Sequence, residues 1–498
     1  MDKRIPATLV DDSSALYVSE ARIHPRTVDG RFQRLRTLAV WVLLGMFYAF
    51  PWLRWDGRQA VLFDLQARKF YVFGLNFWPQ DFVFLAMLLI IAGMALFFFT
   101  SLAGRLWCGY ACPQTVWTEV FLWIERWTEG DRNSRLKLDA SPWNRRKIAR
   151  RGARHALWIL FALWTGFTFV GFFSPIRALA ADAPLGWSGW ETFWLLFYAI
   201  ATWGNAGFLR EQVCKYMCPY ARFQSAMFDR DTLIIAYDPL RGEPRGPRKR
   251  GLDSVLARAR GLLPKAVADA WVAHAMQPEP AADAASAPAR TRHAPEDLGD
   301  CIDCTLCVQV CPTGIDIRDG LQYECIACGA CIDACDGVMD KIGYPRDLIR
   351  YASQNAVDGK PTRVLRPRIV LYAVLLLALV GGFAWGVSHR STLIAEVLRD
   401  RNALYRETRA GIENGYTLKI ANKTMRPQRY RIALVAPDGI ALRDAPAEVR
   451  AGAEQMMSVP LTAAATGPVR GRRDIRFVVV DDDGTRVEVA STFFGPSP

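Results

Sequence analysis

Residues 301–312 read CIDCTLCVQVCP, and residues 325–336 read CIACGACIDACD. Both stretches have the spacing C-x2-C-x2-C-x3-C, which is typical of bacterial ferredoxins with two cubane iron–sulfur clusters. In such ferredoxins the fourth cysteine of each run binds the cluster of the other run. We therefore predict two [4Fe-4S] clusters, one bound by Cys301, Cys304, Cys307 and Cys335, and one by Cys325, Cys328, Cys331 and Cys311. The alternatives are a zinc site or a disulfide framework, but zinc sites use C-x2-C pairs with a longer gap, often with histidine.

The overall composition points to a membrane protein. The chain has 498 residues, enough for several domains, and 51% of them are hydrophobic. A formal net charge of +13 is compatible with nucleic acid, but the apolar residues gather in long blocks, so membrane lipid is the expected partner and nucleic acid is not. All twelve cysteines lie between Cys108 and Cys335, so no disulfide is expected after residue 390.

Five stretches are apolar and close to the length of about 20 residues that a membrane-spanning helix needs. They are residues 37–53, 82–104, 156–176, 192–209 and 369–388. The first 36 residues are polar and charged and do not resemble a cleaved signal peptide. We therefore predict a multi-pass α-helical membrane protein with five spans.

The basic residues predict its orientation. Residues 105–154, after the second stretch, contain eleven Lys and Arg, whereas the short loop after the third stretch contains only Arg177. Because cytoplasmic loops are enriched in Lys and Arg, the first loop is expected inside and the second outside. Five spans then place the N-terminus and the cysteine-rich region in the cytoplasm and the C-terminal region outside it.

The remaining segments complete the predicted domain order. After the fifth stretch, residues 416–421, 429–435, 456–461 and 475–480 alternate or run apolar between turn signals, which predicts a small β-sandwich. Residues 252–276 have the spacing of an amphipathic helix, and the segment that follows is rich in Pro and Ala. The predicted order is a cytoplasmic segment 1–36, a four-span membrane domain 37–240, a linker 241–298, a ferredoxin-like domain 299–350, a fifth transmembrane helix 367–389 and a β-sandwich 410–498.

Four further cysteines form two C-x3-C-P motifs, Cys108 with Cys112 and Cys214 with Cys218. Each motif follows the cytoplasmic end of a predicted span, so both pairs are expected at one depth, where they can meet. Residues i and i+4 share a helix face, and Pro113 and Pro219 disfavour helix just before them. Four such thiolates would suit Cu(I) or a further iron–sulfur cluster. The alternative is that they are buried, inert cysteines.

These motifs together resemble the FixG/CcoG family of membrane-bound cytochrome c oxidase accessory proteins. The resemblance rests mainly on AGRLWCGYACPQTVWTE (103–119), on residues 204–234 around the second C-x3-C-P motif, on the cysteine-rich residues 299–346 and on the C-terminal region. It implies five spans, two [4Fe-4S] clusters and an immunoglobulin-like C-terminal domain outside the cytoplasm. It also implies a role in maturing cbb-type oxidases by reducing Cu(II) to Cu(I), with oxidase subunits or copper chaperones and transporters as partners.

We therefore predict an electron-transfer protein that acts as a cupric reductase. A cytoplasmic donor, which the sequence does not identify, would reduce the clusters, and electrons would pass to a copper or cluster site built by Cys108, Cys112, Cys214 and Cys218. Two alternatives remain, a ferredoxin-type membrane subunit of a respiratory reductase chain and a non-catalytic oxidase assembly scaffold. The oligomeric state is open, and a homodimer is one option.

Overall fold

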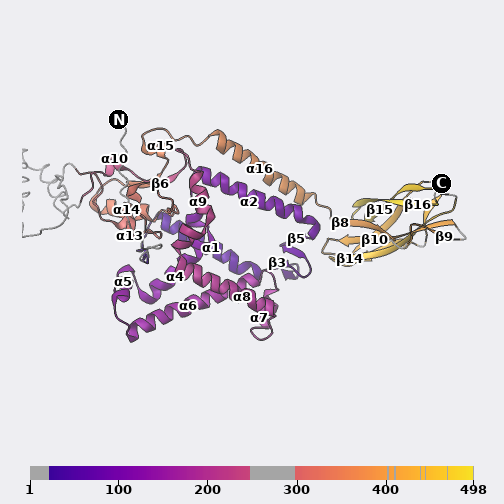
Figure 1. Cartoon of the computed structure of the whole chain (residues 1–498), viewed down its shortest axis with the longest axis horizontal. Coiled ribbons are helices and arrows are strands. Elements are labelled where there is room, and N and C mark those ends of the chain that lie inside the picture. Colours follow the sequence, from indigo (N-terminus) through magenta and orange to yellow (C-terminus); the bar gives the residue numbers. More distant parts are fainter. Residues whose placement is uncertain are drawn as a thin grey trace, which may run out of the picture. The chain divides into compact units, whose positions relative to one another are not determined.

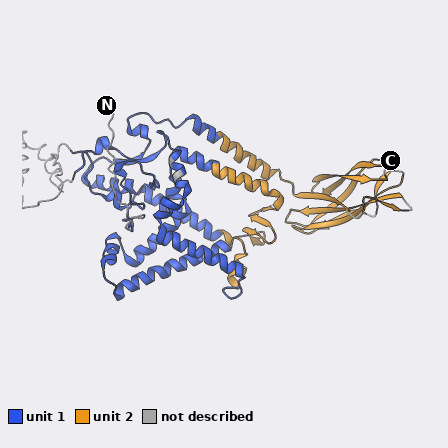
Figure 2. Ribbon diagram, viewed as in Figure 1, with its two compact units in different colours: residues 1–49, 94–170, 182–373 blue, residues 50–93, 171–181, 374–498 orange. Residues whose placement is uncertain are grey.

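The computed structural model describes residues 22–246, 298–400, 403–408, 411–437, 439–443, 445–467 and 469–496. Most of the predicted linker, including the predicted helix at 252–276, lies outside these residues. The chain divides into two compact units (Figure 2). The first comprises residues 1–49, 94–170 and 182–373, and the second comprises residues 50–93, 171–181 and 374–498.

Four described helices are long and apolar enough to cross a membrane (Figure 1). They are α1 (Arg31–Ala49) with the turn that follows it, α2 (Phe82–Ala103), α6 (Arg145–Val170) and α16 (Pro367–Ser388). Almost all of α2 and α16 is apolar and unburied within the protein, as expected of helices that face lipid. These helices coincide with four of the five predicted spans.

The segment predicted as the fourth span has a different form. The helix α8 (Gly189–Thr202) is capped by the preceding Ser188 together with Glu191, and it continues directly into a π-helix at Trp203–Leu209. The α-helical part has only 14 residues, which is short for a span. Four membrane-length helices are therefore present among the described residues, and a fifth span stays a prediction.

Close packing of small residues joins the helices of the first unit. A side chain at Gly166 of α6 would come within 2.4 Å of the carbonyl oxygen of Leu195 in α8, so only glycine permits this approach. Trp158 and Phe121 are completely buried between these helices and α4 (Pro113–Glu129). The stretch 105–154, expected as a loop, is in fact largely helical because α3 (Leu106–Tyr110), α4 and α5 (Arg132–Ala140) precede the start of α6.

A short pair of strands attaches the cysteine-rich segment to the chain that leaves the second C-x3-C-P motif. After α9 (Pro219–Ala226), β6 (Ile234–Tyr237) pairs antiparallel with β7 (Ile349–Ala352). Between them the described segment contains α10 (Pro239–Gly242), α13 (Leu306–Gln309), a 3-10 turn at Ile317–Asp319 and α14 (Ala330–Ile342). A last short helix, α15 (Gln354–Val357), precedes α16. Both ends of the cysteine-rich segment are thereby fixed beside each other.

The C-terminal region is a β-sandwich of the second unit. One sheet has the order β12-β14-β10-β8, with β9 also paired to β10, and the other has the order β13-β11-β15-β16. Leu418, Ile420, Phe477 and Phe493 are fully buried between the sheets. The four predicted strands are confirmed because they lie within β10 (Gly411–Asn422), β11 (Gln428–Val435), β14 (Met456–Ala465) and β15 (Arg472–Asp481). The prediction missed β8 (Leu393–Arg399), β9 (Arg406–Thr408), β12 (Ile440–Arg443), β13 (Glu448–Ala451) and β16 (Arg486–Phe494).

The second unit also contains small strands between α1 and α2 that were not predicted. They are β1 (Arg54–Trp55), β2 (Arg58–Gln59), β3 (Val61–Asp64), β4 (Lys69–Val72) and β5 (Leu75–Phe77). Glu454 of the sandwich accepts hydrogen bonds from the Tyr71 hydroxyl at 2.8 Å and from Nδ2 of Asn76 at 2.7 Å. Polar contacts thus connect these strands to the β-sandwich.

Candidate iron–sulfur and cysteine-pair site

The eight cysteines of the two ferredoxin-like runs line two cavities. The first is lined by Cys301, Cys304, Cys307 and Cys335. The second is lined by Cys311, Cys325, Cys328 and Cys331, with Cys307 also at its wall. Each cavity therefore combines three cysteines of one run with the fourth cysteine of the other, a donor set that fits a cubane cluster.

The two runs adopt the same backbone conformation at matching positions. Asp303 and Ala327, each two residues after the first cysteine of a run, have φ of 53° and 52°. Thr305 and Gly329, each four residues after it, have φ of 56° and 76° and lie at the N-termini of α13 and α14. Left-handed backbone is rare outside glycine and persists where the surrounding structure requires it. Here it curls both runs so that their cysteines face a cavity.

Burial disfavours the charged thiolate form of these cysteines. It raises the pKa of Cys325 and of Cys335 to about 12, and the pKa of Cys331 well above its ordinary value. A metal that binds these cysteines displaces the thiol protons and compensates the negative charge of the thiolates that form. Among the described residues, no three His, Cys, Asp or Glu side chains converge as closely as a single metal ion requires. A cubane differs because each thiolate binds a separate iron, so its ligands surround a cavity.

The C-x3-C-P cysteines lie where regular helix is interrupted. Cys108 belongs to α3, which begins shortly after the end of α2, and Cys112 is the N-cap of α4. Cys214 lies in a π-helix at Val213–Met217, and Cys218 is the N-cap of α9. Pro113 and Pro219 occupy the first turns of α4 and α9, which confirms that they disfavour helix before them. The expectation that each pair shares one helix face is wrong, because the helix ends between its two cysteines.

The structure brings the two pairs together. Burial and then the neighbouring thiol of Cys112 raise the pKa of Cys108 to about 12, with further contributions from Cys214 and Cys218. Burial, Cys112 and Cys218 likewise raise the pKa of Cys214 to about 11. The Cys108 thiol donates a hydrogen bond to Oε1 of Gln224 at 3.3 Å. Four partly buried thiols from two distant segments thus lie in one region.

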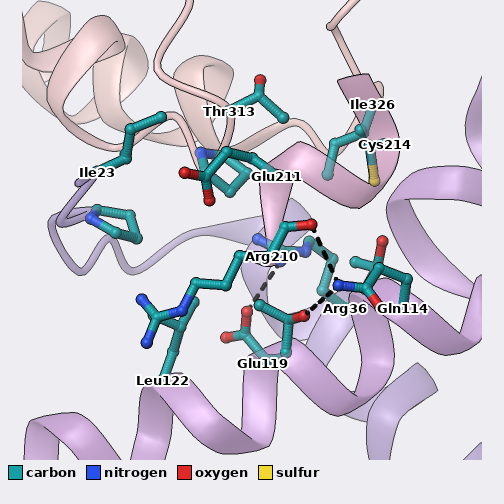
Figure 3. Close-up of a pocket in the computed structure, with 14 residues that line it drawn as sticks. Ile23, Arg36, Gln114, Glu119, Leu122, Arg210, Glu211, Cys214, Thr313 and Ile326 are labelled. Atoms are coloured by element: carbon teal, nitrogen blue, oxygen red, sulfur yellow. Dashed lines mark hydrogen bonds and ion pairs between the residues drawn. The ribbon is translucent and has the colours of Figure 1, made fainter. Parts of the chain in front are cut away.

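This region adjoins the second cysteine-lined cavity. A pocket beside Cys214 is also lined by Thr313, two residues after Cys311, and by Ile326, which follows Cys325 (Figure 3). In the same pocket Arg36 donates to Glu119 at 2.9 Å. The buried guanidinium of Arg105 donates to the backbone carbonyls of Ala221 and Tyr323, so it connects the segments of both C-x3-C-P motifs to the ferredoxin-like segment.

A buried charge network, which the sequence analysis missed, positions both motif segments. The carboxylate of Glu125 in α4 is completely buried and lies 2.9 Å from Nη1 of Arg135 and 2.9 Å from Nη2 of Arg22. It also pairs with Arg210, four residues before Cys214, and lies 3.7 Å from Arg154. Burial alone raises the pKa of Glu125, but the guanidiniums, Arg210 first, lower it to about 2.

This network corrects one reading of the sequence. Arg135 and Arg154 belong to the basic loop residues from which the sequence predicts orientation, but their side chains are only 1% and 2% exposed. They are ion-pair partners of the acidic residues of α4, among which Glu129 also pairs with Arg154 at 2.9 Å. The only signal in the sequence was the presence of acidic residues within an otherwise apolar helix.

The ferredoxin-like segment also binds the start of the first membrane helix. Asp333, which lies between Cys331 and Cys335, accepts hydrogen bonds from the backbone N–H of Phe32 at 3.2 Å and of Gln33 at 2.7 Å. A carboxylate at this position satisfies the free N–H groups at the N-terminus of α1 and complements its dipole. The cysteine runs are thereby fixed to the membrane helices rather than tethered loosely.

These features define a class, that of membrane proteins with a ferredoxin-type two-cluster segment. A family model described as a 4Fe-4S dicluster domain matches residues 209–270 and 272–354, and one described as a 4Fe-4S binding domain matches residues 84–129. A third, for the IG-like fold at the C-terminal of FixG, matches residues 383–496. The protein is therefore an iron–sulfur electron-transfer protein of a membrane, with an immunoglobulin-like C-terminal domain.

Similarity over nearly the whole chain identifies the family. The nitrogen fixation protein FixG of Rhizobium meliloti is 39% identical over 462 residues, which cover 84% of this chain and 80% of that protein. Protein RdxA of Cereibacter sphaeroides is 39% identical over 481 residues, which cover 92% and 90%. A crystal structure of a FixG-related protein from Vibrio parahaemolyticus covers 21% of this chain and 97% of its own, with 25% identity and a TM-score of 0.20. This chain belongs to the FixG family, so the resemblance seen in the sequence is confirmed.

Proposed function

We propose that this protein reduces Cu(II) to Cu(I) at the bacterial inner membrane and supplies the reduced ion during assembly of a cbb-type cytochrome c oxidase. The observation that carries this proposal is the position of the four C-x3-C-P cysteines, which are partly buried and gathered beside a cavity lined by ferredoxin-type cysteines. Copper is the substrate here, and it gains one electron. Oxidase subunits and copper chaperones or transporters are the proposed partners.

The proposed ligand sets follow the two cavities. Cys301, Cys304, Cys307 and Cys335 would hold one cluster, and Cys311, Cys325, Cys328 and Cys331 the other. When bound there, the clusters supply one-electron storage. The initial reductant is a one-electron donor on the cytoplasmic side, either a protein or a small molecule.

The thiols of Cys108, Cys112, Cys214 and Cys218 are proposed to supply the ligands of the copper ion. Because no three of them converge closely enough for one ion in this structure, the two motif segments would close around copper as it binds. Thiolates are soft ligands and favour Cu(I) over Cu(II), so they make the reduction more favourable. Their high pKa in the unloaded protein means that binding releases protons and weakens as pH falls. Arg105, which lowers the pKa of both Cys108 and Cys214, stabilises their thiolate forms.

The test is a double variant, Cys108→Ser with Cys214→Ser, which removes one thiol from each pair. We expect normal content of the two clusters but loss of Cu(II) reduction by protein reduced with dithionite under anaerobic conditions. Ala111→Ser is the matched control, because it adds a hydroxyl within the same motif and keeps all twelve cysteines. Full Cu(II) reduction by the double variant would refute the proposed role of the pairs.

A second candidate function is favoured by one observation. The matches to 4Fe-4S models include both C-x3-C-P segments, at residues 84–129 and 209–270. The pairs would then hold a further cluster, and the protein would be a ferredoxin-type membrane subunit of a respiratory reductase chain. About twelve iron atoms per chain, instead of about eight, together with co-purification of a quinol- or flavin-linked partner, would support this function. Oxidase maturation by a variant without clusters would instead support a scaffold role.

A further inference from the structure

The two cysteine-lined cavities differ in their relation to the C-x3-C-P cysteines. Here the first set is Cys301, Cys304, Cys307 and Cys335, and the second set is Cys311, Cys325, Cys328 and Cys331. The loop that carries Cys325 and Cys328 of the second set lies directly against α3. A side chain built at Gly109 would come within 2.8 Å of the carbonyl oxygen of Ile326 and 2.9 Å of that of Ala327, and within 3.0 Å of Cα of Cys328. These contacts are with backbone, which does not move aside easily. The glycine therefore permits an approach that any larger residue prevents.

The neighbours of Gly109 strengthen the same contact. The Tyr110 hydroxyl donates a hydrogen bond to the carbonyl oxygen of Cys328 at 3.3 Å. The side chain of Cys108 packs against an apolar cluster that includes Ile326 and Cys328. Three consecutive residues of the first C-x3-C-P motif thus touch the cysteine loop of the second set.

The first set has a different environment. Of the twelve cysteines Cys304, which belongs to this set, is the most exposed, and the others are partly or fully buried. The lining of its cavity includes Tyr237, Arg318 and Leu348 and no residue of either C-x3-C-P motif. Cys307 lines both cavities, so the two cysteine sets adjoin each other. The first set therefore includes the most exposed cysteine, and the second contacts the first C-x3-C-P motif.

We propose that Cys108–Tyr110 and the loop from Cys325 to Cys328 form the junction through which electrons leave the ferredoxin-like segment. Cys311, Cys325, Cys328 and Cys331 then belong to the output side. Cys301, Cys304, Cys307 and Cys335 belong to the input side, where the donor approaches Cys304. Each passage moves one electron across the junction to Cu(II), which becomes Cu(I), and no covalent bond within the chain changes.

In this proposal Gly109 is a positioning residue, because electron transfer slows steeply as the distance between donor and acceptor grows. The inference rests on the proposed function for the identity of the acceptor. The order of the two cysteine sets is independent of the proposed function, because it follows from the contacts alone.

The first experiment uses full-length Gly109→Ala, in which every cysteine is retained. Gly337→Ala is the matched control, since a side chain at Gly337 of α14 meets nothing within 4 Å. Each protein is reduced with dithionite, freed of excess reductant and mixed with Cu(II), and reoxidation is followed by freeze-quench EPR. We expect both EPR signals in Gly109→Ala, with reoxidation slower than in the control by about tenfold or more. Equal rates with intact signals would overturn the proposal.

The second experiment needs no copper. Tyr110→Phe removes the hydrogen bond to Cys328, and Arg318→Lys alters a guanidinium that lines the cavity of the first set. We expect Tyr110→Phe to shift the midpoint potential of one EPR signal and Arg318→Lys to shift that of the other, because hydrogen bonds and charge near the sulfurs tune each cluster. A shift of the same signal by both variants would overturn the assignment of sides.

The two experiments separate the two proposals. If the wild-type protein did not reduce Cu(II), the proposed function would fail, and the Tyr110 and Arg318 measurements would still decide the order of the cysteine sets. If Gly109→Ala assembled no clusters, those measurements alone would decide it.

Discussion

At the scale of residues, Glu125 shows how much of the site depends on one buried carboxylate. Its arginine partners come from sequence positions as far apart as Arg22 and Arg210. Removing one partner of a buried ion pair leaves the other charge uncompensated, which typically costs about 3–5 kcal/mol. We expect Glu125→Gln to lower the free energy of unfolding by about that amount, measured by chemical denaturation in detergent. Asp182→Asn, at an exposed acid of the same unit, is the control and should change it by less than about 0.5 kcal/mol.

The pH dependence of the same variant gives an independent prediction. The pKa of Glu125 falls from its ordinary value of 4.5 to about 2 in the folded protein. A carboxyl group with a lowered pKa stabilises the fold fully above its unfolded pKa and loses this contribution as pH falls through the folded pKa. The difference in unfolding free energy between wild type and Glu125→Gln should therefore be constant above pH 4.5 and shrink toward pH 2. A difference that grew on acidification would contradict the assigned ion pairs.

Pairs of cysteine substitutions test whether the ligand sets cross between the two runs. Cys304 and Cys335 line the same cavity, so Cys304→Ser with Cys335→Ser should lose one cluster and keep about half of the iron. Cys304 and Cys311 line different cavities, so Cys304→Ser with Cys311→Ser should lose both clusters. Iron analysis and EPR of anaerobic preparations distinguish the outcomes. The opposite pattern would mean that each run binds its own cluster.

Local spacing explains why the cysteine sets were predictable and the charge network was not. The ligand pattern of Cys301 and Cys325 repeats within a few residues, so a tight loop decides it before any tertiary contact forms. The partners of Glu125 depend on how α4, α6 and the π-helix pack against one another. No short sequence pattern predicts that packing. Gly109 is a similar case, because only its contact with a loop more than two hundred residues further along the chain excludes a larger residue at this position.

At the scale of elements, the strands that alternate over many residues were predictable, and the short ones were not. The strand β10 alternates buried and partly exposed residues through most of its length, whereas β3 and β4 have four residues each. The π-helix that continues α8 was not predictable either, because a helical period of apolar residues does not distinguish it from α-helix. Its extra residue per turn, together with the left-handed φ of 40° at Arg210, ends the helix just before the second cysteine pair.

One ion pair between elements of the second unit is a target for a stability test. Nζ of Lys423, the residue after β10, lies 2.8 and 3.0 Å from the carboxylate oxygens of Asp81, just before α2. Both side chains are buried, so Lys423→Met should lower the unfolding free energy by about 3–5 kcal/mol. Adding Asp81→Asn should recover part of the loss, because the unpaired charge is then removed. Arg429→Met, in an exposed pair with Asp482, is the control and should cost less than about 1 kcal/mol in a calorimetric measurement.

At the scale of the whole molecule, the function depends on which side of the membrane each part faces. The helix α16 has 22 residues and is therefore about 33 Å long, enough to cross the bilayer core. Lys360, Arg363, Arg366 and Arg368 lie close to its N-terminal end, whereas only Arg390 lies close to its other end. Because Lys and Arg concentrate on the cytoplasmic side, this bias favours a cytoplasmic ferredoxin-like segment and a periplasmic β-sandwich.

Labelling with a membrane-impermeant maleimide tests this orientation. Asp358→Cys introduces a thiol at an exposed position before α16, and Arg472→Cys introduces one after it, at a side chain that is 69% exposed. In intact spheroplasts we expect Arg472→Cys to be labelled and Asp358→Cys to react only after permeabilisation. The wild-type protein is the control, because all its cysteines precede α16 and are expected on the cytoplasmic face or within the membrane domain. Labelling of Asp358→Cys alone in intact spheroplasts would place the clusters in the oxidising periplasm, and a cytoplasmic donor would then have no access to Cys304.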